Sequence, residues 1–381
     1  MPFDIKTQLR IQYEVSSGTW VSVQADSFEV DIDRGVEVEQ NTFAKPSVGT
    51  ASVRMIRSSL ADFMNGPQYQ SNMQLRIEYQ APSTAWISLF TGFIQNIEMA
   101  YVVETKKLQV TITANDMGRL ALNTDVALMV VGSGSSRSFI NVMNQLEGVI
   151  TGVDSRYNAS QALSGGSSTY QQASYVFEET NSGAVYEHLL DAELGWLWAN
   201  RDGGMYYHTR ADVNTIQAQT WDVANLTVSN IHSNNVKHVC MDSIQLGYIS
   251  DNIANQVRVT NGVTGVKTTS TNAGSVSAYG RQLADFTVIF DGVSPSSTYA
   301  QWASAVATAA NPKSISQVSV PVITDLGEVS EIAQSEIGSA LQVEFAATGF
   351  TTLQELYMIS RINHTINADH WEMNVSLWRG I

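Results

Sequence analysis

Two strand hairpins, one early in the chain and one at its end, restrict the possible folds most. The first runs from 86 to 114, and its second strand alternates apolar and polar residues without a break, which is typical of a hairpin with one buried face. The segments 356–366 and 371–377 repeat this arrangement through a short polar turn. The two hairpins share a pattern but few residues. They predict a duplicated architecture in which each hairpin is the last strand pair of its own β-barrel.

The part of the chain before and around the first hairpin is rich in further strands. Alternating stretches within 5–23 flank a Ser-Ser-Gly turn and predict another hairpin. The segments 28–32, 47–56 and 74–79 also have strand patterns. One helical turn is expected over 58–64, because an Asn-Gly-Pro sequence follows and ends it. Together these elements predict a compact, mostly antiparallel barrel.

The pattern changes after this barrel. Apolar residues at helical spacing predict a helix over 139–149 and a second over 183–194, with Gly195 as its C-cap. An aromatic hairpin follows directly, beginning with Trp196 and Trp198. These two tryptophans point the same way in a strand. They are predicted to pack on the preceding helix, and the alternative is that they form a sugar-binding platform.

Strand patterns return within 225–260 and at 286–290. The segment 264–278 between them is rich in glycine, serine and threonine and is expected to be mobile. A helix that carries Trp302 is predicted to end at Asn311-Pro312. Three short elements follow, namely a strand at 317–323, a helix at 328–337 and a strand at 341–345.

The predicted fold is therefore mainly β with α+β insertions. It consists of two similar antiparallel β-barrel domains and two smaller α+β domains. The predicted limits are 1–123 for the first barrel, 124–235 for an α+β domain, 236–295 together with 341–381 for the second barrel, and 296–340 for a small inserted α+β domain.

Charge and cysteine content exclude several classes of protein. The formal net charge is −15, from 36 acidic and 21 basic residues, so a sequence-independent grip on nucleic-acid phosphates is not expected. The single cysteine, Cys240, has no partner for an intramolecular disulfide and is expected to be a buried thiol. No stretch is long and apolar enough to cross a bilayer, and the first residues lack a signal-peptide pattern. The chain is expected to be soluble, made in a cytoplasm and not inserted in a membrane.

No group of residues predicts catalysis. Serine nucleophile elbows, Cys-His pairs and carboxylate dyads at recognisable spacing are absent. His364 and His370, which flank a turn, form a candidate two-histidine metal site, but a third ligand is missing. Gly132-Ser133-Gly134 lacks the P-loop lysine and is interpreted as a linker and helix cap. Three acidic residues alternate within 29–33 and predict a solvated or lumen-facing strand surface. The sequence therefore predicts no catalytic, cofactor-binding or metal-binding residues, no cofactor, and a protein that is not an enzyme.

The order of these elements points to a known family. The segment 89–94 and a strand that continues into Asn115-Asp116-Met117-Gly118 come first. A helix before Gly195-Trp196-Leu197-Trp198 follows, and the segments 358–364 and 371–377 close the chain. In this order they resemble the tail hub, or baseplate hub, proteins of tailed bacteriophages, over nearly the whole length of the chain.

The resemblance implies a homotrimer in which the two similar barrels of each chain form a ring of six barrels. Such a ring would adapt the sixfold distal tail protein ring to a threefold tip, spike or fibre protein, at the tail tip or baseplate of the virion. DNA and the tape-measure protein would pass through the ring. Three copies would carry three times −15, or −45, so that an acidic lumen would let DNA slide without specific binding. Many hubs carry a C-terminal extension, and its lack here implies that host recognition belongs to other proteins.

Two other functions remain compatible with the sequence. The first is a carbohydrate-binding, receptor-binding β-protein of a virion, which would use surface tryptophan and tyrosine. Tight glycan binding by the isolated monomer would favour it. The second is a hydrolase of unfamiliar type whose site is assembled across domains, although the sequence shows no convergent acid, base and nucleophile set.

Overall fold

The computed structural model describes most of the chain, including both predicted hairpins. The described residues are 8–23, 25–39, 43–58, 69–80, 85–131, 139–157, 175–209, 227–229, 238–240, 243–248, 253–262, 264–288, 296–309, 313–321, 335–346, 353–367 and 370–378.

The N-terminal strands form the first half of a 15-stranded sheet. Their bounds are β1 Leu9–Ser16, β2 Thr19–Ser22, β3 Ser27–Glu39, β4 Phe43–Pro46, β5 Thr50–Arg57, β6 Gln74–Gln80, β7 Trp86–Val102 and β8 Lys107–Asp116. They follow the order β3-β5-β8-β7-β6-β1-β2, and every pair is antiparallel. Both hairpins predicted in this region are confirmed, as β1–β2 around Gly18 and as β7–β8.

The C-terminal strands form the other half of the same sheet. Their bounds are β13 Thr227–Ser229, β14 His238–Cys240, β15 Ser243–Tyr248, β19 Lys313–Pro321, β20 Ala340–Phe345, β21 Leu353–Ile366 and β22 Trp371–Trp378. The closing hairpin β21–β22 is confirmed as antiparallel. Every second residue from Trp371 to Leu377 is buried, as its alternating pattern predicts. Short β13 is the exception in direction, because it runs parallel to both β14 and β20.

The two hairpins resemble each other in detail. The first part of β7 pairs with β6 and its second part with β8. Likewise, β21 pairs first with β20 and then with β3, while β22 covers its other edge. Each hairpin has one irregularity in register, between Ile94 and Asn96 in the first and between Ile359 and Arg361 in the second. Such bulges bend a strand and increase its twist, which is what a strand that exchanges neighbours requires.

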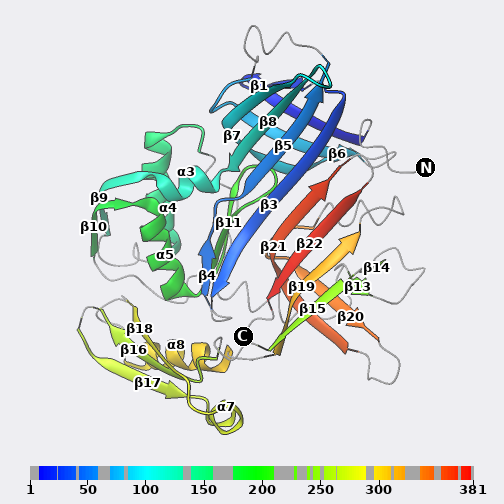
Figure 1. Cartoon of the computed structure of the whole chain (residues 1–381). Helices are drawn as coiled ribbons and strands as arrows, with labels where there is room; N and C mark the ends of the chain where they lie inside the picture. Colours follow the sequence, from blue (N-terminus) through cyan, green and yellow to red (C-terminus); the bar gives the residue numbers. More distant parts are fainter. Residues whose placement is uncertain are drawn as a thin grey trace.

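The pairing of β3 with β21 joins the two halves into one sheet, as Figure 1 shows. The register places Gly35 opposite Arg361. A Cβ atom at Gly35 would lie 2.5 Å from the Ser360 carbonyl oxygen, so this position requires glycine. Beside it, Asp33 accepts a hydrogen bond from Arg361 Nε at 2.6 Å across the same strand pair. The sequence did not predict this junction.

Helices and three small sheets surround the large sheet. The helices are α3 Gly118–Asn123, α4 Phe139–Val153, α5 Ser182–Glu193, α7 Ala273–Tyr279 and α8 Ser296–Ala309, and the remaining strands are β9 Asp125–Val131, β10 Tyr175–Asn181, β11 Trp196–Ala199, β12 Met205–His208, β16 Gln256–Asn261, β17 Lys267–Thr271 and β18 Leu283–Val288. Figure 1 shows α3, α4 and α5 beside the large sheet, with β9 and β10 outside them. The sheet β17-β16-β18 lies below, together with α8.

Two hydrophobic cores hold these layers together. The first lies within the large sheet and includes Val30, Ile362 and Trp371. The second connects α4, α5, α8 and the small sheets, and includes Phe139 and Trp302. Both helices predicted from apolar spacing, over 139–149 and 183–194, are present as α4 and α5. No helix in the described part of the chain combines the length and the apolar character that a membrane crossing needs.

Two local predictions are wrong. The left-handed C-cap of α5 is Leu194, with φ 55°, and not Gly195. Gly195 is needed for a different reason, because a Cβ there would lie 2.8 Å from the carbonyl oxygen of His208 in the paired strand. The segment 264–278, expected to be mobile, instead contains β17 and most of α7. Threonine and serine fit a pleated strand, and Asn272 caps the helix by accepting the N–H of Ser275.

Several predictions are not tested by the described residues. The helical turn at 58–64, the helix at 328–337, the Gly132–Gly134 linker and the side chain of Cys240 all lie largely or wholly outside them. The domain limits also remain predictions. Strand pairing does show that β16, β17 and β18, which were expected within the second barrel, form a sheet of their own.

Candidate interaction surfaces

The strands β9 and β10 form a two-stranded ribbon with one buried face. Met129 lies opposite Phe177, and both side chains are buried in the core that contains α4 and α5. The rings of Phe177 and His188 on α5 pack in a T-shaped arrangement, with their centres 5.6 Å apart. The alternation of the strands therefore has a clear inward side, which packs the ribbon on the helices.

The outward face of the ribbon exposes large apolar side chains. Val130 lies opposite Val176, and Leu128 lies opposite Glu178. Leu128, Val130 and Val176 are 58%, 52% and 47% exposed. Contiguous exposed apolar patches often mark surfaces that contact a partner, so this cluster is a candidate for one. This face, defined as Leu128, Val130, Val176 and Glu178, is called the ribbon face below.

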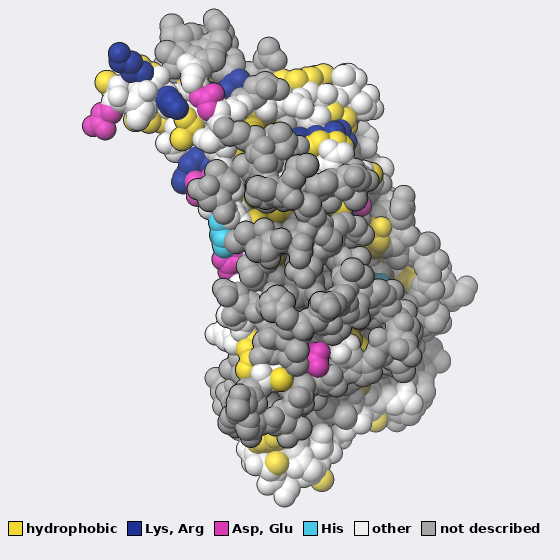
Figure 2. Space-filling model, turned by 90° about the vertical axis from the view of Figure 1, so that its right-hand side faces the viewer, with side chains coloured by type: hydrophobic (Ala, Val, Ile, Leu, Met, Phe, Trp, Pro, Cys, Tyr) yellow, Lys and Arg dark blue, Asp and Glu magenta, His cyan; other side chains and the backbone are white. Residues whose placement is uncertain are grey.

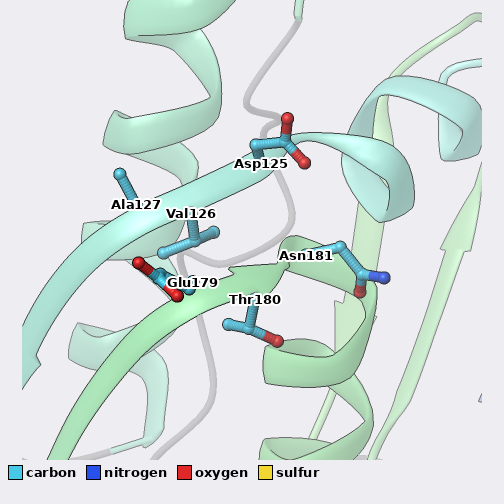
Figure 3. A pocket seen from close by; sticks show the side chains of 6 residues that line it. All are labelled: Asp125, Val126, Ala127, Glu179, Thr180 and Asn181. Atoms are coloured by element: carbon cyan, nitrogen blue, oxygen red, sulfur yellow. The ribbon is translucent and has the colours of Figure 1, made fainter.

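A hollow of about 480 Å³ lies at the base of the ribbon, where β10 leads into α5 (Figure 3). It is lined by Asp125, Val126, Ala127, Glu179, Thr180 and Asn181. Asn181 is already engaged, because its Oδ1 accepts the N–H of Ala184 at 2.8 Å and caps α5. Asp125 and Glu179 lie at opposite sides of the hollow in Figure 3. The hollow therefore adds two acidic side chains at the base of the ribbon.

The tip of the β7–β8 hairpin is a second exposed apolar surface. Tyr101 and Val102 are more than one third exposed, and Val103 is 75% exposed. Lys106 and Lys107 follow, and they are the only two basic residues adjacent to each other in the sequence. Val102 lies opposite Lys107 in the hairpin. Figure 2 shows basic, acidic and hydrophobic side chains together at the upper end of the molecule, the end at which β7 and β8 lie in Figure 1.

The tryptophans considered for a sugar platform are both buried. All four residues of β11 are buried, and Trp196 and Trp198 are 1% and 2% exposed. Trp196 packs against Trp378 with ring centres 5.0 Å apart, within the core of the large sheet. Leu197 belongs instead to the core that contains α5. The platform interpretation is therefore wrong, and so is the prediction that the tryptophans pack on the preceding helix.

The two histidines considered for a metal site have other partners. His364 is buried, and its Nδ1 accepts the indole N–H of Trp371 at 3.3 Å. His370 lies 3.2 Å from Glu372. Among the described residues there is no group of three side chains that could hold a metal ion.

Charged side chains are buried where the two halves of the sheet meet. Arg34 on β3 is 2% exposed and donates to Glu336 Oε1 at 2.8 Å. The other carboxylate oxygen of Glu336 accepts the backbone N–H of Arg201 at 3.1 Å, so this acid also ties in the β11–β12 turn. Asp116, at the end of β8, is 1% exposed. Removal of Glu336 would be destabilising, because the buried charge of Arg34 would then be left without compensation.

Burial shifts the pKa values of the titratable groups around Arg34 in opposite directions. It raises the pKa of Asp116 to about 7, although the Gly118 N–H and the positive charge of Arg34 act against this increase. Burial and, to a smaller extent, the positive charge of Arg34 together lower the pKa of His364 to about 3. His364 is therefore neutral at physiological pH, which fits its role as an acceptor for Trp371.

The acidic residues that alternate along β3 lie on its solvated side, as predicted. Asp31 is exposed, and Glu29 and Asp33 are partly exposed. Glu29 pairs with Arg54 on β5 at 2.8 Å, and Asp33 pairs with Arg361 on β21. These pairs connect β3 to both of its neighbours. That this surface lines a lumen remains a proposal.

Comparisons with known proteins identify the fold. No protein-family model matches the chain, and no curated protein matches it by sequence. Solved structures do match. The tail protein from Neisseria meningitidis MC58 is 8% identical, with a TM-score of 0.61, over 97% of this chain and 95% of that protein. The 43 kDa tail protein of prophage MuSo2 from Shewanella oneidensis is 11% identical, with a TM-score of 0.58, over 98% of both chains.

These matches show that the chain has the fold of phage tail proteins over almost its entire length. The predicted fold class, mainly β with antiparallel sheets and α+β insertions, is confirmed, and the predicted resemblance is confirmed as far as the fold of phage tail proteins. At about one residue in ten identical, the shared property is the fold alone. The function of this chain is therefore addressed below as a proposal.

Proposed function

We propose that the chain is a structural protein of a phage tail, and that it serves as the hub at the distal end of the tail. The observation that carries this proposal is the match to two tail proteins over at least 95% of each chain. A match of that extent includes both halves of the large sheet, the helices and the inserted small sheet. A shared common domain would match only part of each chain.

In the proposed assembly, three copies form a ring around the channel for DNA and the tape-measure protein. The two related hairpins, β7–β8 and β21–β22, support this, because a duplicated chain offers two similar surfaces to a sixfold neighbour. The ring would contact the distal tail protein on one side and a tip, spike or fibre protein on the other. A formal charge of −45 in three copies favours a lumen that repels DNA phosphates.

The proposed role is structural and includes no catalytic step. The carbohydrate-binding alternative loses one candidate platform, because Trp196 and Trp198 are buried in the core, while Trp20 and Trp86 stay partly exposed. The proposal therefore assigns recognition of the host surface to another tail protein.

Light scattering of the purified chain, alone and with the distal tail protein, tests the proposal. A trimer would have three times the mass of 41.6 kDa, or about 125 kDa. Electron microscopy of that species is expected to show a ring with a central opening. A strict monomer under both conditions would contradict the hub proposal, and tight glycan binding by that monomer would support the receptor-binding alternative.

A further inference from the structure

The hairpin tip and the ribbon face carry matching cross-strand pairs. At the tip, apolar Val102 lies opposite basic Lys107. On the ribbon face, apolar Leu128 lies opposite acidic Glu178. Each surface therefore places one apolar and one charged side chain at the spacing of a cross-strand pair, about 5 Å, and the two charges are opposite.

We propose that the β7–β8 tip of one copy docks on the ribbon face of a second copy of this chain. The inference rests on the proposed function and deepens it, because it names the surfaces through which the copies assemble. In the proposed contact, Val102 and Val103 cover Leu128, Val130 and Val176, while the lysines of the tip face Glu178.

The charge of the whole chain favours a second copy as the occupant. The chain is strongly acidic, and its only pair of adjacent basic residues is at the tip. The ribbon has the opposite character, because Glu178 is followed by Glu179 and Asp125 lies at the base of the same strand pair, opposite Asn181. Complementary patches of this kind steer two molecules into one orientation and disfavour contact between identical patches. The tip also carries the exposed Glu104 beside its two lysines, whereas a ribbon-to-ribbon contact would bring only acidic charges together.

The contact is also of the type that builds a ring. Tip and ribbon face are different surfaces, so the contact is heterologous, and repeated heterologous contacts close into a ring when the rotation between copies permits it. The ribbon face combines three exposed valine or leucine side chains with one acid. An apolar centre with charge at its rim is the arrangement that protein interfaces show.

Charge reversal in the full-length chain tests the contact by light scattering. Lys107→Glu and Glu178→Lys should each raise the dissociation constant of the assembly about fivefold, since an ion pair is replaced by repulsion. The two changes in one chain should restore the constant to within about twofold of the original. Lys267→Glu, which reverses an exposed lysine on β17, is the matched control and should leave it unchanged.

Cross-linking gives a second measurement that does not depend on affinity. Chains with Cys240→Ser and Val102→Cys are co-expressed with chains that carry Cys240→Ser and Leu128→Cys. A disulfide between the two kinds of chain is expected under mild oxidation. Each kind expressed alone should give far less cross-linked product, because its cysteines would lie on like surfaces.

The outcomes separate this inference from the proposed function. A trimer that none of the charge reversals weakens, and that forms no disulfide between the two kinds of chain, overturns the docking contact but not the hub. A dimer or an open chain of copies that responds to charge reversal supports the contact and contradicts the trimer. A monomer under all conditions, including with the distal tail protein, overturns both.

Discussion

Replacing Gly35 with alanine tests whether the β3–β21 pairing holds the two halves of the sheet together. The added Cβ would lie 2.5 Å from the Ser360 carbonyl oxygen and 2.6 Å from the Cα of Arg361. Both are backbone atoms, so no side-chain rotation relieves the overlap. The strands must separate, and this also disturbs the adjacent Asp33–Arg361 ion pair.

The expected loss of stability follows from these contacts. Overpacking against rigid surroundings destabilises by about 1–3 kcal/mol. Alanine offsets part of this, because it reduces the entropy of the unfolded chain by about 0.4–1 kcal/mol relative to glycine. We expect Gly35→Ala to lower the free energy of unfolding by about 1–2 kcal/mol in urea titrations followed by tryptophan fluorescence.

Hydrogen exchange locates the effect, and a second glycine provides the control. Amides of β3 and β21 should exchange faster in Gly35→Ala, while those of α4 should not change. Gly148 lies in α4 with open space around it, so Gly148→Ala should raise stability by about 0.5–1 kcal/mol. If Gly35→Ala were as stable as the original chain, with unchanged exchange in β3 and β21, the proposed role of this junction would be wrong.

Three further predictions concern buried groups. The raised pKa of Asp116 means that the folded chain binds its proton more tightly than the unfolded chain. The free energy of unfolding should therefore fall as pH rises from about 4 to about 7. Asp116→Asn should reduce this dependence on pH in urea titrations across that range. The lowered pKa of His364 has the opposite effect, because the free energy of unfolding should fall as pH drops from about 6.5 to about 3. His364→Gln should reduce this loss at acidic pH in the same titrations. Trp196→Ala should destabilise by about 3–5 kcal/mol in thermal unfolding, because the ring is fully buried against Trp378; a loss under about 1 kcal/mol would contradict that packing.

Local patterns were sufficient to predict most elements of the fold. The strand alternation around 86–114 and 371–377 predicted β7, β8 and β22, and helical spacing predicted α4 and α5. These predictions succeed because burial of one face imposes a period of two on a strand and of about 3.6 on a helix. Composition alone misled at 264–278, where small polar residues form β17 and α7 because Asn272 caps the helix and β16 pairs with the strand.

The candidate surfaces were harder to predict. Leu128 and Val130 have the same apolar character as the core residues around them, and only the packing of α4 and α5 decides which face of the ribbon stays exposed. The tip lysines were visible in the sequence, but as part of a polar link between strands. Their proposed role depends on the exposure of the apolar residues beside them, which a linear pattern does not show.

The sequence by itself determined the class of fold, the two related hairpins and the acidic character of the chain. The tertiary structure decided which strand edges meet and which core each face enters. Gly35 and Arg361 are paired although they lie at opposite ends of the chain, and Trp196 and Leu197 enter different cores although they are neighbours. The physical reason is that alternation records only that a face is buried. The partner that buries it is set by backbone hydrogen bonding and close packing between segments distant in sequence.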